Sequence, residues 1–222
     1  MRLSVVDHYL SGMTTQIDHI KAELSELHGL MTLTPEADWI LPTACGGFAV
    51  RDVVGHLVAS RRMPMPEAAG WLALHGLRLN AAAYRVSRRE GKRPIEQLLT
   101  GLADAAVEPR SKGLSRLQPL DVMLADVVTH HEDIRWGLGL RRTMPTDLAH
   151  DVLSAAVRLR GLGTWGTRRR AKGVSLHAVD VDWRWGQGPL VSGTADALLL
   201  GLGGRHIARV DLRGDGVPRL TR

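Results

Sequence analysis

Apolar residues recur at intervals of three and four along most of the first 140 residues, the spacing that places side chains on one face of an α-helix. Pro and Gly clusters interrupt this pattern and divide it into segments. A shorter helical piece at about Pro94–Val107 lies in a long connection before the last segment. Four long helices are predicted, at about Leu3–Leu30, Ala49–Met63, Glu67–Arg89 and Leu120–Leu138. Such a set predicts a helical bundle, in which sites are built from side chains on facing helices.

The pattern changes after Pro145. One more helix is predicted at Asp147–Arg160, and the next segments are shorter, richer in turn residues and partly alternating. The predicted elements are a strand within Val174–Asp182, a turn-rich hairpin at Trp183–Pro189, a strand at Leu190–Ser192, a capped helix at Thr194–Leu202 and a closing strand at Ile207–Leu212. The predicted fold class is therefore α+β and mainly α, with a four-helix bundle at 1–144 and a small α+β domain at 145–222.

Composition restricts the class of protein. The chain has 222 residues, 44% hydrophobic and 23% charged, which is typical of a globular protein. No apolar run approaches the length of about 20 residues that a membrane helix needs, and the N-terminus lacks the pattern of a signal peptide. The single cysteine, Cys45, excludes an internal disulfide and a paired-cysteine metal motif. We expect a cytoplasmic protein with no membrane partner.

The net charge of +6 is partly clustered, in one run at 85–93 and another at 168–172. Neither run is interleaved with aromatic residues, as the binding surfaces for single-stranded nucleic acids are. Solvated helix faces are the favoured interpretation, and nucleic-acid binding, which would show steep salt dependence, ranks last.

One candidate site lies on the predicted helix at 120–138. Asp126 and His130 are four residues apart and Asp133 is seven from Asp126, so all three face one side. A carboxylate and an imidazole one turn apart can chelate a divalent ion, and an exposed polar face with one hydrogen bond gives the same spacing. His56 lies on the flank of another predicted helix, either as a third ligand or as a surface histidine. His131 aligns with apolar positions and is interpreted as a core histidine.

Three runs carry a resemblance to a known family. The run 43–57, TACGGFAVRDVVGHL, resembles the signature C-x-G-W-x-V-R-D-V-V-x-H-L of the mycothiol-dependent maleylpyruvate isomerase family, with Phe48 in the place of tryptophan. The run 126–135, DVVTHHEDIR, is similar to the family pattern E-x-x-x-H-H-x-D-I. The run 192–205, SGTADALLLGLGGR, resembles the closing helix of the small sterol-carrier-like domain of that family. The resemblance as a whole covers the chain from about residue 15 to its end.

The resemblance implies a DinB-like four-helix bundle that binds zinc or another divalent ion through His56, Asp126 and His130, with open positions for water or a thiol. The family has Glu where Asp126 stands, so this ligand reaches less far. Asp133 would then orient His130 through its other ring nitrogen, or else lie on the helix surface. Arg205 matches a family arginine that helps to bind or activate substrate, so the resemblance implies a catalytic role for it. The alternative is an ordinary cation at a helix C-terminus. Cys45 is not assigned to catalysis, because no motif supplies it with a base.

Two functional hypotheses follow from these residues. The first is a metal- and thiol-dependent enzyme that activates a low-molecular-weight thiol such as mycothiol for isomerisation or S-transfer on a small electrophile. The second is a non-catalytic binding module for a small anionic or apolar ligand, with a structural or absent metal, which predicts no thiol dependence. Replacement of His130 by Ala separates them, since only the enzyme loses metal and activity together.

Overall fold

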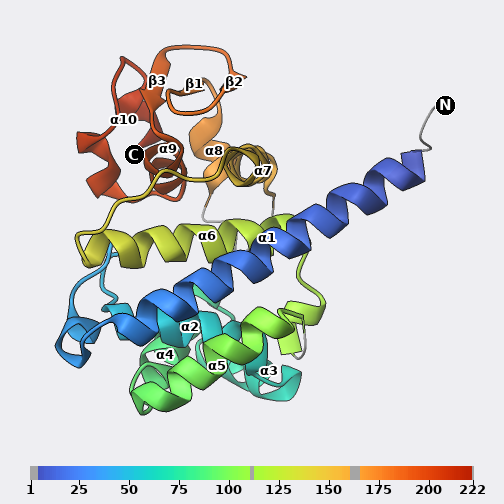
Figure 1. Ribbon diagram of the computed structural model, residues 1–222, viewed down its shortest axis with the longest axis vertical. Coiled ribbons are helices and arrows are strands. Elements are labelled where there is room, and N and C mark those ends of the chain that lie inside the picture. Colours follow the sequence, from blue (N-terminus) through green and yellow to red (C-terminus); the bar gives the residue numbers. More distant parts are fainter. Residues whose placement is uncertain (1–4, 111–112, 161–165, 222) are drawn as a thin grey trace.

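The N-terminal part of the chain folds as a four-helix bundle, as the sequence predicts (Figure 1). The computed structural model describes residues 5–110, 113–160 and 166–221, except for the side chains of residues 5–14 and 113–114. The predicted start of the first helix at Leu3 lies outside the described residues. The bundle helices are α1 (Val5–Leu33), α2 (Val50–Arg62), α5 (Ile95–Val107) and α6 (Leu120–Gly137). The connecting elements are α3 (Met65–Leu74), α4 (Leu79–Glu90) and 3-10 turns at Glu36–Ile40 and Gly113–Arg116.

The C-terminal part lies beyond α6, on the side of that helix away from α2 and α5 (Figure 1). It holds a three-stranded mixed sheet of order β2-β1-β3, in which β1 runs antiparallel to β2 and parallel to β3. Its elements are α7 (Thr146–Arg158), α8 (Thr167–Ala171), β1 (Ser175–Ala178), β2 (Trp183–Gly186), β3 (Leu190–Gly193), α9 (Ala195–Leu202), a 3-10 turn at His206–Val210 and α10 (Val217–Leu220). The predicted fold class, mainly helical with a small α+β part, is confirmed.

The predicted third helix of the bundle is wrong: α5 takes that place, although the sequence pattern puts it in the connection before the last helix, and the predicted Glu67–Arg89 segment lies among the connecting elements. Two further predictions about single elements are also wrong. The single helix predicted at Glu67–Arg89 is divided into α3 and α4, because Gly76 and Leu77 have φ angles of +61° and +62° and end the first helix in a left-handed turn. The closing strand predicted at Ile207–Leu212 is instead a 3-10 turn against α9, and Arg213 alone forms a bridge to the sheet there, through Ser192. In the first place the apolar spacing fits one helix as well as two, and in the second it fits a strand as well as a helical turn. The local backbone geometry decides between them in both.

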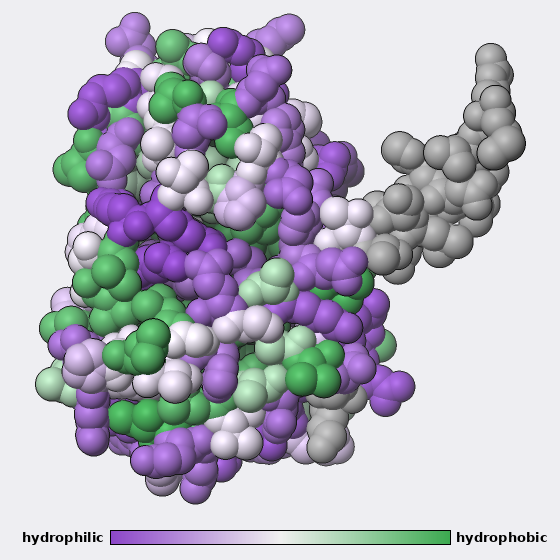
Figure 2. All heavy atoms as spheres, in the orientation of Figure 1, coloured by the Kyte–Doolittle hydropathy of each residue, from purple (hydrophilic) through white to green (hydrophobic). Residues whose placement is uncertain are grey.

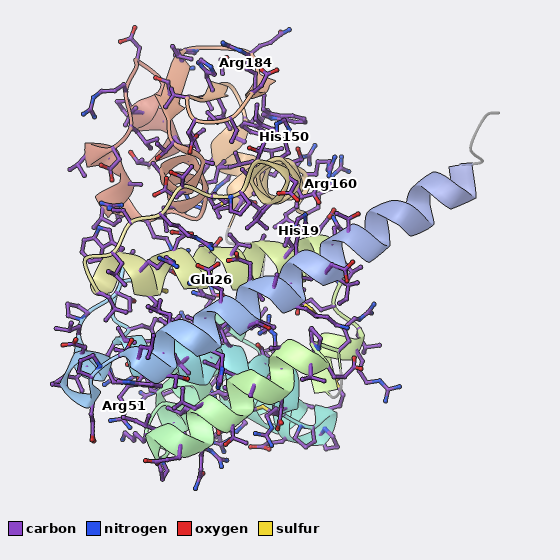
Figure 3. The ribbon with its side chains drawn as sticks, in the orientation of Figure 1. His19, Glu26, Arg51, His150, Arg160 and Arg184 are labelled. Atoms are coloured by element: carbon purple, nitrogen blue, oxygen red, sulfur yellow. The ribbon has the colours of Figure 1, made fainter. Side chains whose placement is uncertain are left out.

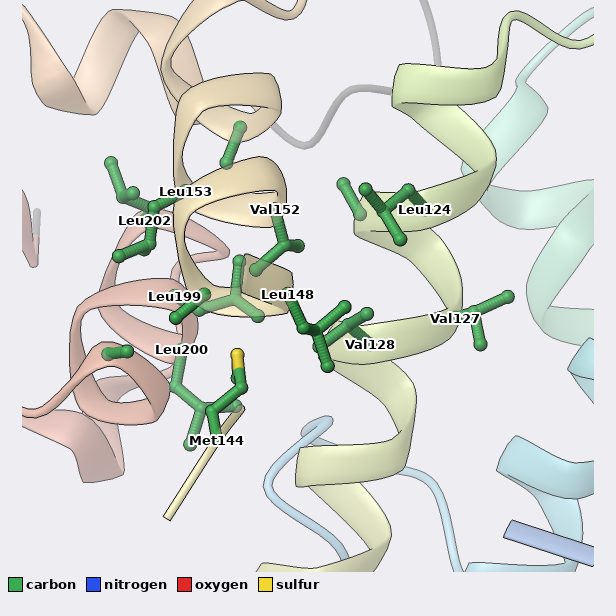
Figure 4. Close-up of a cluster of buried hydrophobic side chains, with 14 of the residues drawn as sticks. Leu124, Val127, Val128, Met144, Leu148, Val152, Leu153, Leu199, Leu200 and Leu202 are labelled. Carbon is green, nitrogen blue, oxygen red and sulfur yellow. The ribbon is translucent and has the colours of Figure 1, made fainter. Parts of the chain in front are cut away.

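Helix α6 lies at the centre of the molecule. It packs against α1 and α2 on one side and against α7 and α9 on the other, and every residue from Met123 to Ile134 is buried. Figure 4 shows Leu124 and Val128 of α6 facing Leu148 and Val152 of α7. The buried apolar cluster is therefore continuous across the predicted boundary at residues 144 and 145, and that boundary stays a prediction. No described helix combines the length and apolar character needed to cross a membrane.

Helices α2 and α4 cross in direct backbone contact at two glycines. A Cβ atom on Gly55 would lie 2.5 Å from the amide nitrogen of Gly91 and 2.7 Å from the carbonyl oxygen of Ser87. A Cβ atom on Gly91 would lie 2.8 Å from the carbonyl oxygen of Arg51. The crossing places His56, the next residue of α2, beside Ser87.

We expect Gly55→Ala to lower the free energy of unfolding by about 2 kcal/mol, because the added methyl meets backbone atoms that cannot move independently. The matched control is Gly29→Ala on the exposed face of α1, where no atom lies within 4 Å of the new Cβ. That change is expected to stabilise the chain by up to about 1 kcal/mol through helix propensity alone. Urea unfolding of both variants measures the difference, and equal effects of the two changes would contradict the close crossing.

Candidate metal centre

Helices α2 and α6 bring His56, Asp126 and His130 together inside the bundle. The Nε2 atom of His56 lies 3.2 Å from Oδ1 of Asp126, and the Nε2 atom of His130 lies 3.6 Å from the same oxygen. The three ligand atoms lie within 4.8 Å of one another. Asp126 and His130 are buried and the His56 side chain is 24% exposed, so the cluster meets solvent at His56 on α2. The shorter side chain of Asp126 still reaches both histidines.

The hydrogen bonds of His56 assign its tautomer. Its Nδ1 atom lies 3.2 Å from the hydroxyl of Ser87 on α4. That hydroxyl donates its own hydrogen to the carbonyl of Ala83 at 2.7 Å, so it accepts the Nδ1 hydrogen of His56. The lone pair of a neutral His56 is therefore on Nε2 and points at Asp126.

The same assignment holds for His130. Its Nδ1 atom lies 2.9 Å from Oδ2 of Asp133, a carboxylate that can only accept. Arg205 fixes this carboxylate in turn, because its Nε donates to Oδ1 at 3.0 Å and its Nη2 donates to Oδ2 at 2.6 Å. A third hydrogen bond joins Arg205 to the carbonyl of Gly203 at 2.7 Å. The lone pair of His130 is thus also on Nε2, held in place by a buried chain of polar contacts from α9 to α6.

The result is a convergence of hydrogen-bond acceptors. When both histidines are neutral, two imidazole lone pairs and one carboxylate oxygen point at the same small volume, and such groups repel one another unless a cation or a proton lies between them. Burial lowers the pKa of His130, which favours its neutral form. Burial acts to raise the pKa of Asp126, but His56, His130 and Arg61 outweigh it and hold that pKa well below its usual value. A neutral His130 and an ionised Asp126 are protonation states that metal ligation requires.

Sequence reasoning missed Arg61, which completes the surroundings of Asp126. This side chain is 1% exposed, and its Nη2 atom lies 3.5 Å from Oδ2 of Asp126, the oxygen turned away from the histidines. Its Nη1 atom donates to the carbonyl of Leu57 at 3.0 Å and to the hydroxyl of Ser60 at 2.7 Å. Oδ1 of Asp126 therefore faces the two histidines, and Oδ2 faces the guanidinium of Arg61. The signal in the sequence was an arginine within the apolar stripe of its helix, a position where charge needs a buried partner.

Cys45 lies next to the cluster, where its sulfur, a nitrogen of His130 and a carboxylate oxygen of Asp133 are within 4.8 Å of one another. Burial raises the pKa of the Cys45 thiol to about 11, and the nearby carboxylates of Asp133 and Asp126 act in the same direction. The thiol is therefore protonated at neutral pH and a poor nucleophile. Because His130 and Arg205 already occupy both oxygens of Asp133, this second group of potential ligands is closed to an ion.

A third group, Glu23, Glu26 and His131, is also within ligand distance but already holds cations. Arg142 bonds both oxygens of Glu23, at 2.9 and 2.6 Å, and Glu26 at 2.7 Å. His131 is fully buried and meets Glu23 through Nδ1 at 2.9 Å, which confirms its interpretation as a core histidine. Glu26 is labelled beside α6 in Figure 3, and Figure 2 shows that hydrophilic residues gather across the middle of the same face. Of the three groups found in the described part of the chain, the cluster of His56, Asp126 and His130 differs in that its arginine, Arg61, lies at the carboxylate oxygen turned away from the histidines.

The predicted residues thus fall into two layers. His56, Asp126 and His130 meet at the cluster, and Asp133 is 0% exposed and bonded to His130, so the surface alternative does not hold for it. Arg205 is 7% exposed and is bonded to Asp133 rather than to the cluster itself. Its predicted contact with a substrate stays a prediction.

The fold and the cluster together define a class: a helical bundle with a buried two-histidine, one-carboxylate site and a small α+β part packed on it. Among solved structures, the fold is similar to a histidine-to-alanine variant of the mycothiol-dependent maleylpyruvate isomerase, with a TM-score of 0.58 and 14% sequence identity, covering 91% of this chain and 92% of that chain. It is also similar to a crystal structure described as the mycothiol-dependent maleylpyruvate isomerase, with a TM-score of 0.55 and 16% identity, covering 86% and 89%. At this identity the similarity shows the fold. No protein-family model and no curated protein matches the chain.

Proposed function

We propose that the chain is a metal- and thiol-dependent enzyme. In this proposal Nε2 of His56, Oδ1 of Asp126 and Nε2 of His130 hold one divalent ion, zinc first among candidates. The enzyme uses a low-molecular-weight thiol such as mycothiol for isomerisation or S-transfer on a small electrophile. The observation that carries the proposal is the geometry of the cluster: three potential ligand atoms lie within 4.8 Å of one another, and the Nδ1 contacts of both histidines turn their Nε2 atoms toward Asp126. The shared fold with the mycothiol-dependent maleylpyruvate isomerase supports the choice of thiol.

A bound ion of this kind lowers the pKa of a thiol on an open coordination position and so supplies a thiolate at neutral pH. Catalytic zinc sites typically have three protein ligands. The fourth coordination position of the ion then stays open for water or substrate. The residues around the cluster hold its geometry: Ser87 fixes His56, Asp133 fixes His130, and Arg61 occupies the second oxygen of Asp126. Arg205 acts on His130 through Asp133, and a direct contact with substrate is part of the proposal.

The protonated state of the Cys45 thiol supports the proposal that the reacting thiol comes from a small molecule. It is the one cysteine of the chain, and burial with two neighbouring carboxylates raises its pKa to about 11. A nucleophilic sulfur at this site therefore has to arrive with a small molecule, bound where the metal stabilises its ionised form.

Metal content tests the first half of the proposal. We expect about one equivalent of a divalent ion in wild type, measured by elemental mass spectrometry after purification without an affinity tag. His56→Ala and His130→Ala are each expected to lose it. His150→Ala on α7, which lies apart from the cluster, is the matched control and is expected to keep it (Figure 3). Absence of metal in wild type after reconstitution with excess zinc, or retention in both cluster variants, would overturn the proposal.

Spectroscopy of cobalt-substituted protein tests the second half. Addition of mycothiol is expected to produce the near-ultraviolet charge-transfer band of a cobalt–thiolate bond, because the thiol occupies the open position. The S-methyl derivative of mycothiol, which cannot form a thiolate, is the matched control and is expected to leave the spectrum unchanged. Identical spectra with and without mycothiol would favour a binding module with a structural metal.

A further inference from the structure

We propose that a cleft in the C-terminal part, away from the metal centre, binds a small organic anion with a flat apolar body. The cleft has a volume of about 660 Å³ and lies between the C-terminal end of α7, helix α8 and strand β2. It shares no lining residue with the candidate metal centre. A volume of several hundred cubic ångströms is the size range of sites for small ligands.

The floor of the cleft is apolar and its wall carries an aromatic ring. Val157, Leu159 and Ala171 line it with side chains that are otherwise buried in the core. Trp185 of β2 also lines it and is 42% exposed, an unusual state for so large a ring. Trp185 lies on the same face of β2 as Trp183, which bonds to Ser154 of α7 at 3.0 Å, so the ring is turned toward α7.

Four cations surround this apolar floor. Arg160 follows α7, Arg168 and Arg169 lie on α8, and Lys172 follows that helix; all four are exposed and line the cleft. None of them forms an ion pair with a carboxylate among the described residues. Arg170, in the middle of the run, is turned elsewhere and donates to the carbonyl of Leu202 at 3.4 Å. The local charge of the cleft is therefore strongly positive, and an anion entering it meets no competing acid.

A second cleft of the same chain shows what a neutralised surface looks like. It has a volume of about 460 Å³ and is also lined by arginines, among them Arg62, Arg89 and Arg93. Each of these three pairs with an acidic side chain: Arg62 with Asp104 at 3.3 Å, Arg89 with Glu67 at 2.6 Å, and Arg93 with Glu90. The two clefts thus differ less in volume than in charge. The arginines of the second cleft are paired with carboxylates, whereas the four cations of the first form no ion pair among the described residues.

The combination of parts selects the ligand class. Four cations without an apolar surface would suit phosphate, and an apolar cleft without cations would suit a neutral hydrophobe. Here a tryptophan face and an aliphatic floor offer stacking and burial to a flat body, while the rim offers charge to a carboxylate, sulfonate or phosphate on it. Among the described residues that line the cleft, Trp185 is the one aromatic ring, and a single ring does not stack successive bases of a nucleic acid.

Fluorescent probes of matched shape test this site in the full-length chain. Anilinonaphthalene sulfonate carries the charge, and N-phenylnaphthylamine has nearly the same rings without it. We expect Arg168→Gln/Lys172→Gln to weaken binding of the sulfonate about tenfold and to leave binding of the neutral probe unchanged. Trp185→Ala is expected to weaken both probes about fivefold, because stacking does not depend on the charge.

Arg184→Gln is the matched control, since it removes one positive charge from the opposite face of the same strand and does not line the cleft (Figure 3). It is expected to change neither affinity, and His130→Ala is expected to change neither, which separates this site from the metal centre. Sulfonate binding that survives both cleft variants, or that inorganic phosphate abolishes at constant ionic strength while Trp185→Ala has no effect, would overturn the proposal. The double variant changes exposed residues only, so it tests the cleft even if Trp185→Ala fails to fold.

Discussion

Replacement of Asp133 by Ala is expected to lower the free energy of unfolding by about 3–5 kcal/mol, because it leaves the guanidinium of Arg205 buried without a carboxylate. Asp133 is fully buried, and Arg205 and His130 use both of its oxygens. Burial acts to raise the pKa of Asp133, yet Arg205 and His130 lower it, so the ionised form is the one that these contacts hold. Denaturant unfolding at neutral pH measures the loss.

The same change is expected to weaken metal binding about 10–100-fold, since His130 loses the acceptor that fixes its tautomer and ring orientation. Competition with a chromophoric chelator measures this affinity independently of any enzymatic activity. An unfolding loss below about 1 kcal/mol would contradict the buried ion pair as the link between α6 and the turn after α9.

A double variant separates the two effects. Asp133→Leu/Arg205→Met replaces the ion pair with apolar side chains of similar size, a change that is often neutral for stability. We expect it to recover most of the lost stability while metal affinity stays low, because Leu cannot accept the Nδ1 hydrogen of His130. Recovery of both properties would mean that Asp133 acts on the metal centre through folding alone.

Three of the four bundle helices, α1, α2 and α6, were predictable because Pro and Gly residues mark where each of them ends. The stripe of α2 runs from Val50 to Arg61 and ends before Pro64, and the observed helix ends within two residues of the predicted bounds. The division between α3 and α4 could not be predicted, since a break at Gly76 and Leu77 leaves the apolar spacing on both sides almost unchanged. Strand Ile207–Leu212 failed for a related reason: a short apolar run fits a strand and a helical turn equally well.

The candidate site shows the limit of spacing. The interval between Asp126 and His130 predicts a shared face, but α6 is buried all round, so its pattern does not say which neighbour that face meets. His56 joins the cluster from 70 residues away, and Glu23 meets His131 from 108 residues away. Contacts over such separations depend on how the helices pack, and one sequence contains no direct record of that packing.

The basic run at 168–172 shows the same limit at the surface. The sequence favours a solvated helix face, and the structure does expose Arg168, Arg169 and Lys172. What the run cannot show is that Trp185 and the end of α7 lie opposite it and form a cleft. Charge in a sequence identifies a candidate surface, whereas its partners and the shape beside it decide whether that surface binds anything.

The wild-type chain is expected to lose stability in acid partly through Glu23. Burial alone would raise the pKa of this carboxyl, but hydrogen bonds from His131 and Arg142 lower it from 4.5 to about 2. A pKa that is lower in the folded state than in the unfolded state stabilises the fold above the unfolded value and loses that contribution as pH falls through the folded value. We therefore expect Glu23 to contribute about 1.4 kcal/mol of lost stability per pH unit between pH 4.5 and about 2, roughly 3 kcal/mol in all.

Urea unfolding of wild type and Glu23→Gln at several pH values isolates this contribution. The stability difference between the two chains is expected to be largest above pH 4.5 and to shrink steadily toward pH 2, because glutamine does not titrate. Glu26→Gln is the matched control: Glu26 bonds to the same Arg142, but its side chain is 45% exposed, so solvent screens its ion pair and the replacement is expected to change the free energy of unfolding by less than about 1 kcal/mol. A Glu23→Gln difference that stays constant across this range would mean that the carboxylate is held by shape and hydrogen bonding rather than by its charge.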